Sequence, residues 1–489
     1  MPKEKSIVQN SIFNFIKTFS SVAFPVITFT YSARILGVDG VGQINFAKSI
    51  ITYFTMFSLL GMNHYGTREA AKLRGDRDRL SKYVHEMMLL SGAMTLFAYV
   101  LLFLSMLFVP KLHSYTALLL VDSLAIVLQG MGMEWLYQGL EEYRYIAVRS
   151  VLFQVGALVA MFIFVRDAGD VVPYAAVTLA ANSGSYVLNF VNARKYIHLR
   201  WYGNYEVKKH LRPLLWLFAM TVSIELFAVL DSTMLGFLQG DAAVGRYTAA
   251  VKVNKLVNTL ITAVGVVLIP RLSFYISQGK WEKVKELVNK VYNYVFMLSV
   301  PAAIGLFTLS NEIILLFSGS GFASAAFTMR LLTPIVLISP IGMTTNFQTF
   351  IPMGKDKLIF RSTMSGAVTN LICNSLLIPR FAENGAAIAT VAAEAVITIV
   401  CLTCAREFFD LRQIFRKYYQ YWLAAIPIPL IAMLTKALPV HYVIRMFVVM
   451  ALSAVCYFLL LLVLKNDDLF EAFQMVRSKL MGKQDGEIS

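Results

Sequence analysis

Charged side chains interrupt long apolar stretches of this sequence, where charge is least expected. Five of them are basic: Lys17, Arg34, Lys48, Lys252 and Lys255. Each charge near the centre of a bilayer costs about 2.5–3.5 kcal/mol on insertion scales, so such residues normally face a wet cavity or a partner. Lys252 and Lys255 are three residues apart and share one face of a helix. An excess of positive charge in a cavity suits an anionic head group such as a diphosphate.

Carboxylates occur in similar stretches. They are Asp122, Glu134, Glu225, Asp231 and Glu394. Cations prevail in the segments that hold Lys17 to Lys48 and Glu225 to Lys255, so the acids there do not neutralise all the bases. For the deeper residues the alternative is a purely structural ion pair. Asp122 and Glu134 are expected to pair within the N-terminal half, or to take part in function.

A second alternative applies to charges near the ends of the apolar stretches. Long side chains there can snorkel to the membrane interface without serving a site. This interpretation competes for Arg34, Lys17 and Lys48, and it is favoured for the following residues: Arg246, Glu312, Arg330 and Arg445.

The sequence contains no pattern that indicates catalysis. It has no phosphate-binding Walker loop, no H-E-x-x-H and no G-x-S-x-G. Cys401 and Cys404 form a C-x-x-C, but it ends an apolar stretch and is interpreted as packing. We therefore expect no enzyme, no metal and no cofactor, and an energy source other than ATP.

Composition places the chain in a membrane. Of its 489 residues, 57% are hydrophobic and only 15% are charged, against roughly 25% charged in soluble domains. The mean hydropathy is +0.63. The net charge is +15, but the basic residues recur in short clusters and not as one stripe, which argues against a nucleic-acid partner.

Hydropathy predicts an all-α polytopic membrane protein with about fourteen spans, each near the ~20 residues that a bilayer requires. The predicted spans are 10–36, 43–66, 84–109, 115–138, 148–166, 171–194, 213–236, 246–270, 291–317, 324–350, 362–381, 386–405, 420–438 and 443–464. The last two are interrupted by prolines, which membrane helices tolerate.

The loop charges predict the orientation of these spans. With the N-terminus in the cytoplasm, 32 of the 44 Lys and Arg residues fall in inside segments and five in outside loops. Such a bias follows the positive-inside rule, so both termini are predicted to be cytoplasmic. The outside loops are short, so no extracytoplasmic domain is expected.

A weak internal repeat predicts two lobes. ILGVDGVGQINFAK (35–48) and MLGFLQGDAAVGRYTAAVK (234–252) both carry L-G, an acidic turn, V-G, an alanine five residues later and a lysine. Parallel repeats of this kind are one architecture that transporters use. We predict an N-terminal six-helix lobe (1–194), a cytoplasmic linker (195–212), a C-terminal six-helix lobe (213–405), two additional spans (406–464) and a cytoplasmic tail (465–489).

Three segments carry a resemblance to a known family. SARILGVDGVGQINFAKSI (32–50), EWLYQGLEEYRYIAVRS (134–150) and VLDSTMLGFLQGDAAVGRYTAAVKV (229–253) resemble the Wzx-type polysaccharide flippases of the multidrug/oligosaccharidyl-lipid/polysaccharide exporter superfamily. The resemblance runs from about residue 6 to 465. It implies two lobes around a central cavity that moves an undecaprenyl-diphosphate-linked oligosaccharide across the bacterial cytoplasmic membrane by alternating access, for O-antigen, capsule or exopolysaccharide.

The resemblance also assigns roles to residues. It implies diphosphate contact by Arg34 and Lys252 first, and then by Lys17, Lys48 and Lys255. Glu225 and Asp231, together with Asp122 and Glu394, are candidates for binding a coupling proton or sodium ion or for holding those cations. The expected partners are membrane lipids and a polysaccharide polymerase, and the expected state is a monomer.

Two relatives within the superfamily and one enzyme class are the alternatives. A lipid II flippase would share the fourteen spans. A drug–cation antiporter of bacterial type often has an acidic residue in its first span, but residues 6–38 contain neither Asp nor Glu. A polymerase or ligase would need a large outside loop, and none is predicted.

Overall fold

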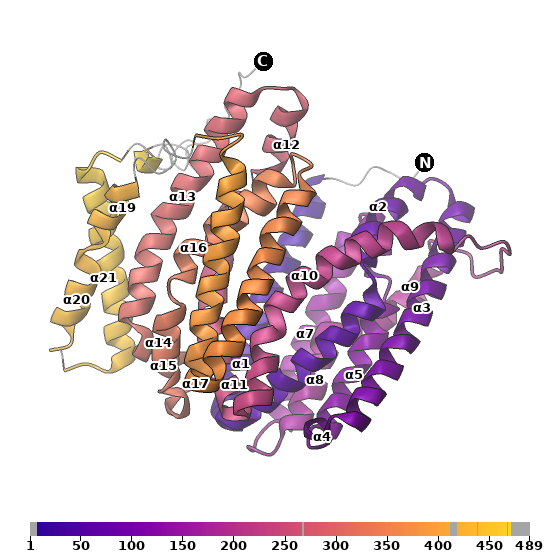
Figure 1. Ribbon diagram of the computed structural model, residues 1–489, viewed down its shortest axis with the longest axis horizontal. Helices are drawn as coiled ribbons and strands as arrows, with labels where there is room; N and C mark the ends of the chain where they lie inside the picture. Colours follow the sequence, from indigo (N-terminus) through magenta and orange to yellow (C-terminus); the bar gives the residue numbers. More distant parts are fainter. Residues whose placement is uncertain (1–6, 267, 411–417, 438, 467, 471–489) are drawn as a thin grey trace. The chain divides into compact units, whose positions relative to one another are not determined.

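The computed structural model of this protein is helical throughout and has no strand among the residues it describes (Figure 1). These are 7–266, 268–410, 418–437, 439–466 and 468–470. The all-α fold class is therefore confirmed. The predicted tail lies mostly outside the described residues.

The chain forms two compact units. Unit 1 contains residues 1–248, 317–322 and 378–383, and unit 2 contains the rest. The helices that belong wholly to unit 1 are α1 (Ile7–Leu59), α2 (Met62–Leu73), α3 (Arg77–Phe108), α4 (Pro110–His113), α5 (Thr116–Gly130), α6 (Glu134–Gly139), α7 (Tyr143–Phe164), α8 (Val171–Ser183), η1 (Gly184–Tyr186), α9 (Val187–Ala193), α10 (Lys208–Gln239) and η2 (Ser320–Phe322).

Three helices cross the boundary between the units, namely α11 (Asp241–Val266), α14 (Ser310–Ser318) and α17 (Asp356–Ala405). The helices wholly in unit 2 are α12 (Ile269–Ser277), α13 (Trp281–Thr308), α15 (Ala325–Leu332), α16 (Ile335–Met343), η3 (Thr344–Phe350), α19 (Tyr418–Ala425), α20 (Pro427–Thr435) and α21 (Tyr442–Val463). The predicted lobe boundary at 195–212 does not coincide with the unit boundary, because α10 packs against α1 and α2. The lobe division stays a prediction.

Eight helices in the described part of the chain are long and apolar enough to cross a membrane, or nine if a bent pair at 325–350 is one span. This number is lower than fourteen partly because α1 and α17 each contain two predicted spans. Their two halves meet at single non-helical residues, Gly37 (φ 68°) and Ala382 (φ 48°). Other predicted spans are divided into short helices, as at α19 and α20. The count of fourteen is consistent with this pattern and remains a prediction.

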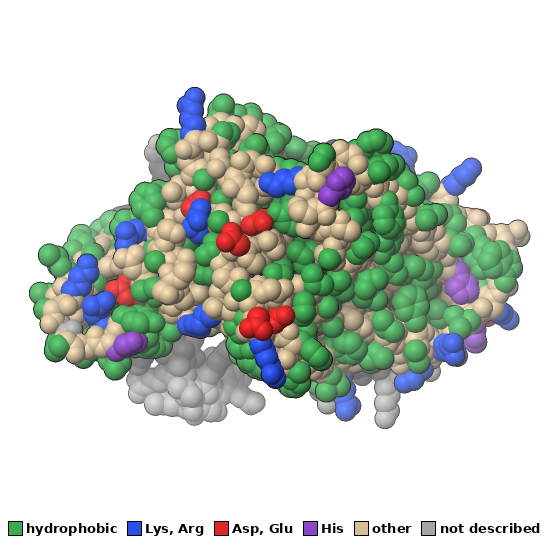
Figure 2. All heavy atoms as spheres, turned by 90° about the horizontal axis from the view of Figure 1, so that it is seen from below, with side chains coloured by type: hydrophobic (Ala, Val, Ile, Leu, Met, Phe, Trp, Pro, Cys, Tyr) green, Lys and Arg blue, Asp and Glu red, His purple; other side chains and the backbone are tan. Residues whose placement is uncertain are grey.

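Apolar side chains cover much of the surface (Figure 2). On α7 the residues Leu152, Val155 and Val159 recur at helical spacing and are 65%, 55% and 54% exposed. Such a continuous apolar face is unfavourable in water but matches lipid tails. The structure thus supports a multi-pass membrane protein.

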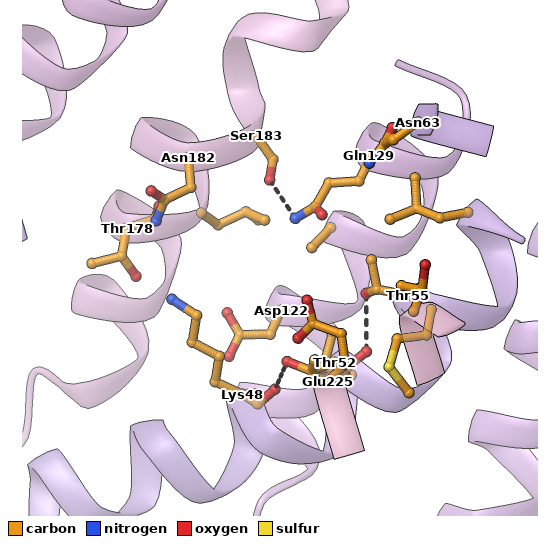
Figure 3. A pocket seen from close by; sticks show the side chains of 16 residues that line it. Lys48, Thr52, Thr55, Asn63, Asp122, Gln129, Thr178, Asn182, Ser183 and Glu225 are labelled. Carbon is orange, nitrogen blue, oxygen red and sulfur yellow. Dashed lines mark hydrogen bonds between the residues drawn. The ribbon is translucent and has the colours of Figure 1, made fainter. Parts of the chain in front are cut away.

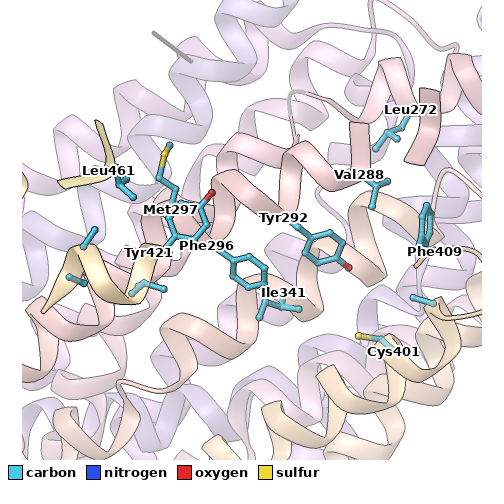
Figure 4. Packing of buried hydrophobic residues seen from close by; sticks show 14 of the residues in the cluster. Leu272, Val288, Tyr292, Phe296, Met297, Ile341, Cys401, Phe409, Tyr421 and Leu461 are labelled. Carbon is cyan, nitrogen blue, oxygen red and sulfur yellow. The ribbon is translucent and has the colours of Figure 1, made fainter. Parts of the chain in front are cut away.

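Each unit has its own apolar core. In unit 1 the side chains of Tyr137, Met87 and Leu136 are fully buried within a cluster that joins α2, α3, α6 and α7. In unit 2, Tyr292 and Phe296 of α13 lie in a cluster with residues of α16, α17, α19 and α21 (Figure 4). Because each core is close-packed, each unit positions its own polar residues firmly.

The sequence repeat has a structural counterpart. Gly37 and Gly240, each five residues before the glycine of the V-G pair, share an unusual backbone conformation, with φ/ψ of 68°/−171° and 85°/−173°. Positive φ is open to glycine at little steric cost and is strained for other residues. Each glycine therefore turns the chain sharply between two helical segments.

The two turns also contact each other reciprocally within unit 1. A Cβ atom added to Gly42 would lie 1.9 Å from the carbonyl oxygen of Asp241, and one added to Gly245 would lie 2.0 Å from that of Val38. Gly42 and Gly245 are equivalent in the repeat, as are Val38 and Asp241. The contact is thus the same on both sides, and it requires glycine at both positions.

Candidate functional site

A polar cavity of about 240 Å³ lies within unit 1 (Figure 3). Five helices line it, and each contributes at least one polar side chain. Lys48, Thr52 and Thr55 follow one another at helical spacing along α1, so they share one face. The other polar lining residues are Asn63 of α2, Asp122 and Gln129 of α5, Thr178, Asn182 and Ser183 of α8, and Thr221 and Glu225 of α10.

Three of the lining residues can carry charge. Asp122 is buried, with 9% of its surface exposed, and its Oδ2 atom has no hydrogen-bond partner among the described residues. Glu225 is half-buried and Lys48 is exposed to the cavity side. Lys48 forms no ion pair closer than 4 Å with any described residue. The cavity therefore combines one ammonium group with two carboxylates.

A second cavity, of about 530 Å³, adjoins the first and shares Leu59, Asn63 and Gln129 with it. Its lining is more basic. The remaining lining residues are Lys17, His64, Thr67, Arg68, Glu134, Gln138 and Tyr186. Together the two cavities form a polar path along α1 inside unit 1.

Glu134 is the centre of an ion-pair network beside this second cavity. Its Oε1 atom accepts a hydrogen bond of 2.8 Å from Lys17, and its Oε2 atom accepts one from Arg149. The Arg149 side chain is 2% exposed, whereas that of Lys17 is 32% exposed. One carboxylate serves two cations, so the group keeps a net positive charge. The expected pairing of Glu134 is confirmed, whereas Asp122 makes no ion pair with a described residue.

The other predicted site residues of unit 1 lie outside these cavities. Arg34 is exposed, and its guanidinium donates to the carbonyl oxygen of Thr30 at 3.2 Å. Asp231 is buried and accepts a hydrogen bond from Tyr247. The structure thus brings Lys48 together with Asp122 and Glu225, and Lys17 together with Glu134.

Three predicted site residues belong to unit 2. Lys252 is half-buried and Lys255 is exposed, both on α11. Glu394 is half-buried on α17. In this unit Glu312 and Arg445, which were expected to snorkel, instead pair with each other at 3.0 Å.

Two further charges differ from the snorkelling expectation. Arg246 forms an ion pair with Glu383 inside unit 1. Arg330 donates from Nε to the hydroxyl of Ser310 at 2.7 Å inside unit 2. Charges near helix ends therefore find protein partners here.

The sequence analysis did not predict the uncharged polar residues of the site. Gln129, Asn182 and Thr178 line the first cavity, yet uncharged polar residues were not considered as candidates. Arg149 was assigned to an inside segment, but it is buried on α7. The signal for its role was its position on α7, because a cation on an otherwise apolar helix needs a partner.

The sequence analysis also did not predict a buried hydrogen-bonded group of three residues near the start of α10. His210 contacts a Glu86 carboxylate oxygen at 2.8 Å through Nε2 and the Tyr65 hydroxyl at 2.8 Å through Nδ1. Tyr65, Glu86 and His210 thereby connect α2, α3 and α10. In the part of the chain that the structure describes, no three His, Cys, Asp or Glu side chains are grouped in a way that would hold a metal.

The lipid-facing helices and the charged cavities within them define a multi-pass membrane protein of transporter type. Comparison with known proteins specifies the family. The chain belongs to the polysaccharide biosynthesis protein family, whose sequence profile matches residues 7–276. This match agrees with the resemblance found in the sequence.

Individual relatives are distant but cover most of the chain. A putative O-antigen transporter of Escherichia coli K12 is 21% identical over 407 residues, which are 82% of this chain and 97% of that protein. A lipid II flippase in an inward closed conformation has a similar fold, with a TM-score of 0.74, 15% identity, and coverage of 93% of this chain and 99% of that one. An inward-facing multidrug resistance transporter matches with a TM-score of 0.64 and 15% identity over 78% of this chain and 94% of that one.

Proposed function

We propose that this protein is a flippase that moves an undecaprenyl-diphosphate-linked oligosaccharide from the inner to the outer leaflet of the bacterial cytoplasmic membrane. The observation that carries the proposal is the surplus of cations around the second cavity of unit 1. Lys17 and Arg149 share the single carboxylate of Glu134, and Arg68 also lines this cavity. A diphosphate carries the negative charge that such a surface lacks.

Family and relatives support this choice of substrate. The family is concerned with polysaccharide biosynthesis, and relatives over most of the chain are described as O-antigen transporters. A lipid-linked sugar unites an apolar tail, which suits the lipid-facing helices, with an anionic head, which suits the second cavity. The oligosaccharide then serves O-antigen, capsule or exopolysaccharide assembly, with a polysaccharide polymerase as the downstream partner.

Transport would follow alternating access. In each cycle the cavity opens to one leaflet and then to the other, and the ligand shifts the equilibrium by binding one state more tightly. No nucleotide-binding motif was found in the sequence, so we propose a proton or sodium gradient as the driving force. We further propose a monomer whose two termini are cytoplasmic.

Charge reversal tests the diphosphate assignment. Arg34→Glu and Lys252→Glu should each abolish surface glycan, because a carboxylate repels the diphosphate at close range. The matched control is Lys357→Glu, which reverses an exposed lysine at the start of α17. Surface glycan is measured by staining or immunoblotting, with membrane levels of each variant measured in parallel. Normal glycan in both Arg34→Glu and Lys252→Glu would refute the assignment.

A lipid II flippase is the second candidate, favoured by the structural likeness with a TM-score of 0.74. The two functions predict different lipids in a deletion strain. Our proposal predicts that an oligosaccharide linked to undecaprenyl diphosphate accumulates on the cytoplasmic side. Accumulation of lipid II instead would select the alternative.

A further inference from the structure

The loop that leads from α9 into α10 in unit 1, residues 194–207, contains no helix but is hydrogen-bonded along its length to the start of α3 (Figure 1). The contacts, each 2.8–3.0 Å long, run from Arg77 Nη2 to the Arg194 carbonyl oxygen, from the His198 N–H to Ser81 Oγ, from Arg200 Nη2 and the Tyr202 hydroxyl to Asp78 Oδ1, and from the Glu206 N–H to Glu86 Oε1. These bonds hold the loop against α3, so the direction in which its side chains point is defined.

This α9–α10 loop exposes two large apolar side chains. Leu199 is 62% exposed and Trp201 is 78% exposed, whereas Ile197 of the same loop is buried. The ring of Trp201 packs edge-on against that of Tyr205, with the centroids 4.8 Å apart. Apolar surface is unfavourable in water, and ordering a loop costs conformational entropy. A loop that is ordered and still directs a tryptophan outward therefore indicates a surface that covers it.

The helices on either side of the loop indicate that this surface is lipid. Both helices expose apolar side chains: Val187, Leu188 and Val191 on α9, and Leu211, Leu215 and Trp216 on α10. Within a membrane these side chains contact lipid tails, so the loop that joins the two helices lies at the level of the headgroups. Tryptophan is enriched at that level, because its ring combines an apolar body with a polar N–H group.

The charge of the segment indicates the kind of lipid. Residues 194–212 contain six basic residues and one acidic residue, Glu206. The basic residues are all exposed and are Arg194, Lys195, Arg200, Lys208, Lys209 and Arg212. A cluster of four to eight Lys and Arg residues at the membrane surface attracts anionic headgroups. Guanidinium and ammonium groups pair with phosphate through charge-assisted hydrogen bonds.

We propose that residues 194–212 bind the anionic headgroup layer of the membrane. Leu199 and Trp201 insert among the first acyl carbons, and the basic side chains contact lipid phosphates. Because the loop is hydrogen-bonded to α3 and continues into α10, it holds the ends of both helices at the depth of the headgroups. The proposal depends on the membrane location of unit 1 and not on the identity of the transported substrate.

A fluorophore on the loop of the full-length protein tests this contact. The four native cysteines are replaced, and Leu199→Cys is labelled with the environment-sensitive dye NBD. The protein is placed in nanodiscs of phosphatidylcholine alone or of a mixture of phosphatidylcholine and phosphatidylglycerol. We expect a shorter emission wavelength and stronger quenching by lipids brominated near the headgroup in the anionic discs. High salt should reduce both effects, because it screens exposed charges.

Charge variants separate attraction by the loop from insertion of the dye itself. Each basic residue near an anionic surface contributes about a fivefold preference for the bound state, so Arg194→Gln combined with Lys195→Gln should shift the equilibrium about 30-fold toward the released loop. The matched control is Lys283→Gln combined with Lys285→Gln, which removes two exposed cations from α13 and should leave the signal unchanged. Trp201→Ser should weaken insertion, whereas Trp201→Phe should preserve most of it.

Two results would overturn the proposal. If the dye stays in water in both kinds of disc, the loop does not contact lipid, and its apolar surface fits a protein partner instead. If quenching is the same with and without phosphatidylglycerol, or the same in the Arg194→Gln, Lys195→Gln variant, the basic residues do not recognise anionic headgroups. No glycolipid is present in these discs, so either failure leaves the proposed transport function untouched.

Discussion

Glu134 is a single carboxylate that pairs with two cations of very different exposure. Arg149 is almost fully buried, and its side chain also stacks within 6 Å of the rings of Tyr145 and Tyr186. Lys17 reaches Glu134 from the half-exposed side. The buried pair therefore fixes the geometry, while Lys17 can exchange its partner at small cost.

Glu134→Gln should destabilise the protein far more than Lys17→Met. The first change leaves the guanidinium of Arg149 buried without a counter-ion, which costs about 3–5 kcal/mol. The second removes a half-exposed partner and should cost about 1 kcal/mol or less. Thermal unfolding in detergent measures both. Equal shifts of the melting temperature would show that Arg149 does not depend on Glu134.

At the scale of elements, the all-α fold and the long apolar helices that hydropathy predicts are present, but the partners of the charges are not predictable. A carboxylate such as Glu134 can be located in an apolar stretch from sequence alone. That it pairs with Lys17, 117 residues away, depends on the packing of α1 against the helices that follow. Asp122 shows the converse, since its sequence context predicts a pair and one of its oxygens has no hydrogen-bond partner among the described residues.

The close contact between the two repeat turns, at Gly42 and Gly245, can be tested by substitution. Gly42→Ala and Gly245→Ala would each force a methyl group against a backbone oxygen, and backbone cannot yield as a side chain can. Each change should cost about 1–3 kcal/mol. Gly92→Ala and Gly156→Ala are the matched controls, because those helical glycines have open space around them and alanine there should stabilise by up to about 1 kcal/mol.

The same variants test whether the contact is a gate. If the two turns must separate for the cavity to open, alanine should weaken the closed state and raise the accessibility of a cysteine placed at Val38. Melting temperature and the rate of maleimide labelling report the two effects separately. Labelling rates equal to those of the control variants would show that the contact is structural only.

For the whole molecule, the distribution of Lys and Arg predicts an orientation that the fold by itself does not determine. Helices of this length can cross a membrane in either direction, and the loop charges supply the direction. The segments around Gly75 and Gly203 carry clusters of basic residues, whereas the turn at Gly169 has only Arg166 nearby. The three glycines lie in loops, and an added Cβ atom would meet no other atom within 4 Å at any of them.

Cysteine labelling in intact cells tests this orientation directly. In a background where the four native cysteines are replaced by serine or alanine, Gly169→Cys should react with a membrane-impermeant maleimide added outside. Gly75→Cys should react only after the cells are permeabilised, because a basic loop stays in the cytoplasm. Gly203→Cys should behave like Gly75→Cys, although its positive φ of 61° makes it the more strained variant. Labelling of Gly75→Cys in intact cells would reverse the predicted orientation and, with it, the side of the membrane from which the cavities would first meet their substrate.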